Sequence, residues 1–98
     1  MKKTKYRLSY SSKFGRDYRK LVRGNRRLAK RVVKAVGQLC ADPFYPGLKT
    51  HTVNIPKTGK FYTSRITGDL RILWTLKEDN IIFLYRIGGH SGGLNVYK

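Results

Sequence analysis

Two apolar runs near the C-terminal end of the chain constrain the fold most strongly, because each has the length and composition of a β-strand. The first spans Leu70 to Leu76 and the second Ile81 to Ile87, and the polar stretch from Lys77 to Asn80 separates them. Their spacing predicts two paired strands of a β-hairpin. The faces expected to point toward the core consist of Leu70, Ile72, Trp74 and Leu76 in the first strand, and of Ile81, Phe83, Tyr85 and Ile87 in the second.

Two further strands are predicted upstream. Residues Lys60 to Thr67 precede the hairpin, and a Gly68-Asp69 turn follows them. Near the N-terminus, the alternation from Tyr6 to Tyr10 is typical of a half-buried strand. The segment from Phe44 to Gly59 contains two prolines and two glycines and is predicted to be irregular. Residues Gly88 to Gly93 are also expected to lack regular structure because of their glycine content.

Two helices are predicted between the first strand and the irregular segment. Ser11-Ser12 offers an N-cap, apolar residues follow at helical spacing, and Gly24-Asn25 ends the helix. A second helix runs from about Arg26 to Cys40, before Asp42-Pro43. The order β-α-α-β-β-β predicts an α+β fold, with the two N-terminal helices packed on one face of a mainly antiparallel sheet.

Length and charge limit the class of protein. The 98 residues are expected to form a single domain, residues 1–98. Twenty-two lysines and arginines against five acidic residues give a net charge of +17, which favours a polyanionic partner, with nucleic acid preferred over an anionic membrane. The longest apolar stretch, Ile81 to Leu84, is far below the roughly 20 residues of a membrane-spanning helix. We therefore expect a cytoplasmic protein without a membrane partner.

The parity of the predicted strands places two arginines on the face away from the core. If Ile72 and Trp74 point inward, then Arg71, Leu73 and Thr75 point outward. Arg65 is the charged candidate for the outward face of the preceding strand. A pair of guanidinium groups is suited to binding a phosphate through bidentate hydrogen bonds. Both arginines could equally be ordinary solvated charges in so basic a chain.

Two histidines and a tyrosine are candidates for proton transfer. His90 lies among glycines, and His51 lies beside Lys49 in the segment expected to be irregular. Imidazole is the natural proton carrier near neutral pH. Tyr97 could stack on a base or donate a proton, or simply pack. The sequence contains no metal-ligand spacing and no phosphate-binding loop, so we expect neither a metal nor another cofactor. Cys40 is expected to be a small core residue.

The C-terminal half resembles the RelE/ParE toxin superfamily of bacterial toxin–antitoxin systems. The resemblance rests on Leu48 to His51, on Tyr62 to Trp74, on Ile87 to His90, and on the near-terminal Val96-Tyr97. The predicted order of strands and helices also agrees with the fold of that superfamily. It implies a toxin that acts on the ribosome as an endoribonuclease (mRNA interferase), cleaves mRNA in the A site to leave a 2′,3′-cyclic phosphate, and is neutralised by an antitoxin with an acidic or amphipathic segment.

The resemblance also implies roles for single residues. Arg65 would stabilise the scissile phosphate, His90 would be a general acid or base, and Tyr97 would orient the base or assist proton transfer. The residue that removes the 2′-hydroxyl proton is open, with His51 as one hypothesis and a lysine of lowered pKa as another. The candidate RNA-binding cations are Lys49, Lys60, Arg71 and Arg86. Tyr97 lies seven positions after His90, whereas many members of the superfamily place the terminal aromatic residue closer.

Two other functions are consistent with the sequence. The same fold also serves ParE-like inhibitors of DNA gyrase, which are not nucleases, so the fold alone does not decide between them. A non-catalytic RNA-binding or ribosome-binding protein would need only the positive charge. The arginines together with His90 and Tyr97 favour the nuclease, because a gyrase inhibitor needs neither a phosphate site nor a proton carrier.

Overall fold

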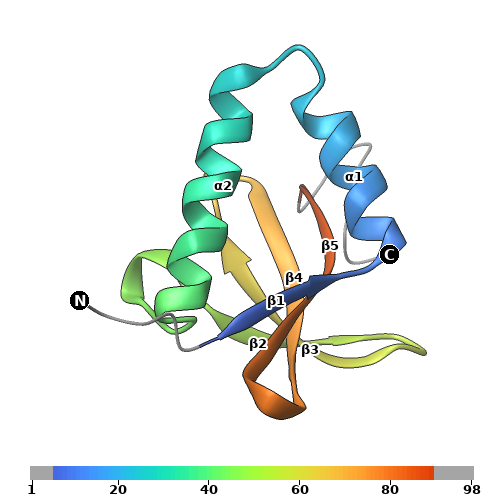
Figure 1. Ribbon diagram of the computed structural model, residues 1–98. Coiled ribbons are helices and arrows are strands. Elements are labelled where there is room, and N and C mark those ends of the chain that lie inside the picture. Colours follow the sequence, from blue (N-terminus) through green and yellow to red (C-terminus); the bar gives the residue numbers. More distant parts are fainter. Residues whose placement is uncertain (1–5, 90–98) are drawn as a thin grey trace.

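The computed structural model describes residues 6–89, and its sheet is covered on one face by two helices (Figure 1). The elements follow in the order β1 (Arg7–Tyr10), α1 (Ser12–Val22), α2 (Arg26–Ala41), the short helix η1 (Pro46–Leu48), β2 (His51–Ile55), β3 (Gly59–Arg65), β4 (Leu70–Lys77), the short helix η2 (Glu78–Asn80) and β5 (Ile81–Gly89). The α+β class and the helices on one face of the sheet are confirmed.

All five strands belong to one sheet in the order β1-β5-β4-β3-β2. The β2–β3, β3–β4 and β4–β5 pairs are antiparallel, and only β1 pairs with β5 in parallel. The expectation of a mainly antiparallel sheet is therefore confirmed. One part of the prediction was wrong: the segment expected to be irregular contains the strand β2, so the order is β-α-α-β-β-β-β.

The sequence signals for the helix ends are present in the structure. The hydroxyl of Ser11 accepts a hydrogen bond from the Phe14 amide at 3.0 Å, which satisfies a free donor in the first turn of α1. Gly24 has φ of 65°, a conformation that glycine adopts without strain, and it separates the helices. The Asn25 side chain accepts a bond from Leu28 at 3.1 Å and caps α2. Within residues 6–89, neither helix has the length and apolar character needed to span a membrane.

The main core lies between the helices and the sheet. Ile72, Trp74 and Ile82 from the sheet are fully buried there, and Phe14, Val32 and Leu39 pack against that face from the helices. The predicted inward face of β4 is confirmed for Leu70, Ile72 and Trp74, whereas Leu76 near the end of the strand is 42% exposed. This layer is the rigid support on which the opposite face of the sheet is built.

The predicted inward face of β5 is confirmed for Ile87 and was wrong for the part of the strand before it. Ile82, Leu84 and Ile87 point into the main core, and Tyr85 belongs to the opposite face. The cause is a β-bulge: Leu73 pairs with Arg86 and Trp74 with Leu84, which leaves Tyr85 as an extra residue. A bulge reverses the alternation along the strand, so a pattern that assumes strict alternation assigns residues 81–85 to the wrong face.

The face of the sheet opposite the helices is not fully open. Leu73 points away from the helices, as predicted, but it is fully buried, together with Ile55, beneath Val53, Phe61 and Tyr85. The rings of Phe61 and Tyr85 stack at 4.8 Å between centroids and 15° between planes. A second, small apolar cluster therefore supports the face of the sheet opposite the helices, which we call the outer face.

The C-terminal end of β5 also differs from the prediction. Gly88 and Gly89 continue the strand and are buried, with Gly88 paired to Arg71 and Gly89 to Leu70. The expectation that this stretch lacks regular structure was therefore wrong for these two residues. Their lack of side chains does not prevent pairing here, because β4 supplies hydrogen-bonding partners on one side.

Candidate nucleic-acid interface

Arg65 and Arg71 meet on the outer face, as the strand parity predicts. Arg65 ends β3, Arg71 is the second residue of β4, and the two are direct partners across the antiparallel pair. Directly opposed residues in such a pair have Cβ atoms about 4.5–5.5 Å apart. Two like charges at that distance repel each other, and an anion between them relieves the repulsion. The register therefore creates a site suited to a phosphate.

The side chain of Arg65 is half-buried, and its Nε atom is buried with no hydrogen-bond partner within residues 6–89. A buried donor without an acceptor costs free energy, and guanidinium donors are suited to phosphate oxygens. A phosphate oxygen at this position would satisfy the donor. The burial also restricts the rotamers of Arg65, so less conformational entropy is lost when an anion binds.

His51 lies on the same face, next to the arginine pair. It is the first residue of β2 and pairs with Thr63, which is two residues before Arg65 on β3. Its exposed imidazole makes a 3.0 Å contact from Nδ1 to the carbonyl oxygen of Lys49. A carbonyl oxygen only accepts, so Nδ1 carries the proton, and in the neutral ring Nε2 keeps a lone pair. The ring is thus oriented with a basic nitrogen free to take a proton.

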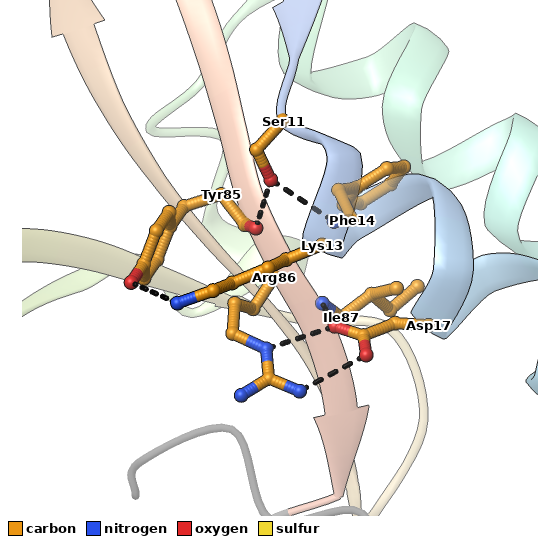
Figure 2. A network of polar contacts seen from close by, with 7 residues as sticks. All are labelled: Ser11, Lys13, Phe14, Asp17, Tyr85, Arg86 and Ile87. Carbon is orange, nitrogen blue, oxygen red and sulfur yellow. Dashed lines mark hydrogen bonds and ion pairs between the residues drawn. The ribbon is translucent and has the colours of Figure 1, made fainter.

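Arg86 is held by a buried carboxylate, as Figure 2 shows. Its Nε and Nη2 atoms each donate to Asp17 at 3.0 Å, and the Ile87 amide donates to the same carboxylate at 3.2 Å. Asp17 is only 5% exposed. The hydrogen bond to Asp17 raises the pKa of Arg86 above its ordinary value, so the guanidinium stays charged. Asp17 thereby joins α1 to the end of β5.

Ser11 completes this junction where β1 ends and the chain turns into α1. Its amide donates to the Leu84 carbonyl at 3.0 Å. Its hydroxyl donates to the Tyr85 carbonyl at 2.6 Å (Figure 2). Lys13 Nζ lies 3.4 Å from the Tyr85 hydroxyl. The bulged part of β5 beyond the end of β1 is therefore supported by polar groups of Ser11 and Asp17 instead of by another strand.

The structure brings some of the predicted residues together and separates others. Arg65, Arg71 and His51 share the outer face, with Arg86 on the next strand opposite Leu73. Lys60, near the start of β3, has the parity of Tyr62 and Ser64, which face the helices, so it lies away from the arginine pair. Lys49 is exposed and holds His51 through its carbonyl group. His90 and Tyr97 lie outside the described residues.

Asp17 is the polar residue that the sequence analysis missed. It falls within the apolar stripe of α1, three residues after Phe14 and four before Leu21, both of which pack in the main core. An acidic residue at such a position has to find a buried partner, and that is a signal that the sequence contains. Arg86 could not be predicted as that partner, because the pattern of apolar and polar residues in β5 does not indicate the bulge that positions Arg86.

The described residues contain no group of three or more histidine, cysteine or acidic side chains that could hold a metal ion. Cys40 is partly buried on α2, and burial raises the pKa of its thiol above the usual value. That shift disfavours the reactive thiolate, in agreement with Cys40 as a small packing residue.

Comparison with known proteins identifies the family. Neither a family model nor a curated protein sequence matches the chain. Solved structures do match it. A metal-bound toxin from Helicobacter pylori is 30% identical, with a TM-score of 0.71 over 87% of this chain and 94% of the toxin. The chain belongs to the RelE/ParE superfamily of toxins.

More distant members share the fold. A YoeB/ParE toxin from Agrobacterium tumefaciens is 15% identical, with a TM-score of 0.73 over 87% of this chain and 99% of that one. The archaeal RelE–RelB complex from Pyrococcus horikoshii contains a chain that is 14% identical, with a TM-score of 0.69 over 91% of this chain and 99% of that one. This RelE/ParE superfamily member therefore has the fold that the sequence predicted. In the Pyrococcus structure, RelE is in complex with RelB.

Proposed function

We propose that this protein is the toxin of a type II toxin–antitoxin system and that it cleaves mRNA on the ribosome without a metal ion. The observation that carries the proposal is the pairing of Arg65 with Arg71 on the outer face, with the unpaired buried Nε of Arg65 and the exposed ring of His51 beside it. A phosphate-binding pair next to an oriented imidazole is the arrangement that phosphodiester cleavage through the 2′-hydroxyl needs.

The proposed reaction is an internal transfer of the phosphodiester. A base removes the 2′-hydroxyl proton, the 2′-oxygen forms a bond to phosphorus, and the bond from phosphorus to the 5′-oxygen breaks. An acid gives a proton to the 5′-oxygen, so the products are a 2′,3′-cyclic phosphate and a 5′-hydroxyl. No electrons are exchanged with another molecule. The steps that the protein must supply are two proton transfers and stabilisation of the extra negative charge on the phosphate.

The residues of the outer face suit these steps. Arg65 is proposed to stabilise the charge on the scissile phosphate, and Arg71 to support it. His51 is proposed as the base, because its Nδ1 donates to the Lys49 carbonyl and its Nε2 remains as acceptor. The proposed acid is His90, with Tyr97 assisting; both follow from the resemblance of the sequence to the superfamily.

An amphipathic antitoxin segment is the proposed regulatory partner. An apolar groove of about 350 Å³ runs between α1, α2 and β1. Its lining includes Leu8, Tyr10 and Val33, which are exposed by 41%, 66% and 63%, and Arg19 contributes a positive charge. An amphipathic segment with acidic residues would cover the apolar side chains and pair with the basic surface around them. We propose the cytoplasm as the compartment, since mRNA and ribosomes are there.

Primer extension on an mRNA in a reconstituted translation reaction tests the nuclease. Wild type should give cuts in phase with codons. Arg65→Ala should reduce the rate on the order of 10²–10³-fold, by analogy with the loss of one oxyanion-stabilising donor. Arg7→Ala is the matched control, because it removes an exposed cation from β1, at the edge of the sheet farther from β3. It should cleave like wild type.

The histidine variants separate the base from the acid. His51→Ala and His90→Ala should each lower the cleavage rate, and each should remove a different limb of the pH–rate profile. If His51→Ala cleaves with an unchanged profile, His51 is not the base. If wild type leaves the mRNA intact at all concentrations, the nuclease proposal fails, and inhibition of gyrase supercoiling is the activity to measure next.

A further inference from the structure

Thr50 separates His51 from Lys49, the residue whose carbonyl oxygen orients the imidazole ring. The contact from His51 Nδ1 to that oxygen measures 3.0 Å. The oxygen belongs to the planar peptide group that joins Lys49 to Thr50, so its direction depends on the backbone of both residues. Lys49 has φ of 52° and ψ of 40°, a left-handed conformation that is unfavourable for residues other than glycine. The surrounding structure must therefore hold this conformation in place.

Both sides of this peptide group are anchored in the protein interior. On the N-terminal side, Leu48 is buried and packs in the main core. On the C-terminal side, the hydroxyl of the half-buried Thr50 makes two hydrogen bonds, at 2.7 Å to the Pro43 carbonyl oxygen and at 2.6 Å to the Ser64 hydroxyl. Pro43 and Ser64 are themselves buried. The Thr50 side chain thus ties the backbone just before β2 to groups that cannot easily move.

The hydrogen bonds to Thr50 have one direction, and they begin in the core. A carbonyl oxygen only accepts, so the Thr50 hydroxyl proton points to Pro43 and the Thr50 oxygen accepts from Ser64. Ser64 in turn accepts from the indole Nε1 of the fully buried Trp74 at 2.8 Å. Each hydroxyl therefore donates once and accepts once. Only this assignment of the protons satisfies all three bonds, and such a chain is rigid.

The alternation of side chains places this chain of hydrogen bonds beneath the candidate site. Successive residues of a strand point to opposite faces of the sheet. Ser64 points toward Trp74 and the helices, and Arg65, the next residue, lies on the outer face. In the same way Thr50 meets Ser64 beneath the sheet, and His51 follows it on the outer face. A change at Thr50 can therefore reach His51 without a change in either arginine.

We propose that Thr50 is a positioning residue for the cleavage reaction: it holds the Lys49 carbonyl toward His51 and so fixes which ring nitrogen takes the 2′-hydroxyl proton. The inference rests on the proposed function, because it takes His51 as the base. The hydrogen bond made by one ring nitrogen decides the tautomer, and only the tautomer with its proton on Nδ1 has a basic Nε2. Thr50 makes no contact with the RNA and acts through His51.

Three variants separate the Thr50 hydroxyl from the rest of the side chain. Thr50→Val removes the hydroxyl and keeps the shape, whereas Thr50→Ser keeps the hydroxyl. Thr58→Val is the control with the same chemical change. Thr58 is exposed in the turn between β2 and β3, and its hydroxyl also donates to a proline carbonyl, that of Pro56 at 3.4 Å. Circular dichroism defines the temperature range in which each variant is folded, and all measurements are made within it.

The tautomer of His51 is measured first, without RNA. Nitrogen NMR distinguishes a ring nitrogen that carries the proton from one that does not, and the signals of His51 are identified by their loss in His51→Ala. At a pH where the ring is neutral, wild type, Thr50→Ser and Thr58→Val should have the proton on Nδ1. Thr50→Val should show a mixture of the two tautomers, because the Lys49 carbonyl is no longer held toward the ring.

Cleavage of mRNA by the same proteins shows the consequence for the reaction. Thr50→Val should lower kcat by about 10–100-fold, by analogy with the hydrogen-bond partners that orient metal-bound histidines. KM should not change, because the arginine pair is intact. Thr50→Ser should restore most of kcat, and Thr58→Val should cleave like wild type. A role of Thr50 in folding alone would change neither the tautomer nor kcat at constant KM.

Three results would overturn the inference. An unchanged tautomer in Thr50→Val, or a wild type with the proton on Nε2, would show that Thr50 does not orient the ring as proposed. A redistributed tautomer with an unchanged kcat would show that this orientation has no part in the reaction. Because the tautomer is measured without RNA, a wild type that leaves mRNA intact refutes the nuclease proposal, and the NMR comparison still decides whether Thr50 orients His51.

Discussion

The two faces of the sheet are built on opposite principles. The face beneath the helices contains large, fully buried apolar side chains, with Trp74 at their centre. Within residues 6–89, no buried side-chain nitrogen or oxygen of that face lacks a hydrogen-bond partner. The outer face has a small apolar cluster around Leu73, and beside it two arginines stand directly opposite each other. One face maximises burial, and the other retains repulsion and an unpaired donor. The comparison indicates that stability comes from the first and binding from the second.

On the face of the sheet beneath the helices, which we call the inner face, a chain of hydrogen bonds satisfies the buried polar groups. The indole Nε1 of Trp74 donates to the Ser64 hydroxyl at 2.8 Å, and Ser64 contacts the Thr50 hydroxyl at 2.6 Å. Thr50 in turn donates to the Pro43 carbonyl at 2.7 Å. Such a chain fixes the segment before β2 against the centre of the sheet. The buried Nε of Arg65 on the outer face has no equivalent partner within residues 6–89.

Trp74→Ala should have the largest effect on stability. The substitution empties the centre of the inner core and leaves Ser64 without its donor, and a loss of about 3–5 kcal/mol in the free energy of unfolding is expected. Chemical denaturation measures it. Leu76→Ala on the same strand is the control and should cost less than about 1.5 kcal/mol, since that side chain is 42% exposed. Equal losses would contradict the assignment of the core to one face.

Leu73→Ala tests whether the small apolar cluster of the outer face also contributes to the stability of the fold. Leu73 is fully buried, yet its neighbours Phe61, Val53 and Tyr85 are partly exposed and can move into the space. The loss should therefore lie near the lower end of the range for such substitutions, about 2–3 kcal/mol. RNA affinity at low temperature, where the variant remains folded, should fall only modestly. A loss as large as that of Trp74→Ala would mean that the two faces stabilise the fold equally.

Asp17→Asn breaks the link between the faces at the end of β5. The side-chain amide oxygen introduced by the substitution can still accept a hydrogen bond from the Ile87 amide, but the charge and one hydrogen bond to Arg86 are lost. The free energy of unfolding should therefore fall by about 1–3 kcal/mol. The loss is smaller than for a fully buried pair because the Arg86 side chain is 22% exposed. RNA affinity should stay equal or rise, since a negative charge disappears. Amide exchange should accelerate at Ile87. Glu78→Gln, an exposed change of the same charge, should alter neither stability nor exchange.

The Asp17–Arg86 pair also has a defined pH dependence. The hydrogen bond to Asp17 raises the folded-state pKa of Arg86 above that of the unfolded chain. The stabilisation is therefore fully present below the ordinary pKa of arginine and is lost as the pH rises through the raised value. No change from this group is expected across neutral and mildly alkaline pH. A stability transition near neutrality that Asp17→Asn abolishes would contradict this assignment.

The features that could be predicted from the sequence are those that depend only on neighbouring residues in the chain. Strand parity predicted that Arg65 and Arg71 share the outer face, because β3 and the first residues of β4 alternate without interruption. The same rule failed in β5, where the bulge at Tyr85 reverses the alternation, and a bulge depends on the partner strand. The strand β2 was missed because its prolines and glycines lie at its borders. Asp17 as the partner of Arg86 is a contact between distant parts of the chain, which no local pattern encodes.

Arg65→Gln should have the smallest effect on the free energy of unfolding. The direction of that change is informative. In the inner core any loss of side-chain atoms destabilises the protein. On the outer face, glutamine in place of Arg65 removes a like charge directly opposite Arg71. The free energy of unfolding should then stay the same or increase by up to about 1 kcal/mol, the range for opposed pairs in a sheet. Denaturation at low salt measures it best, and added salt should reduce the difference because it screens the repulsion. Destabilisation would mean that the packing of the Arg65 stem outweighs its charge, and the loss of cleavage in Arg65→Ala would then no longer separate catalysis from folding.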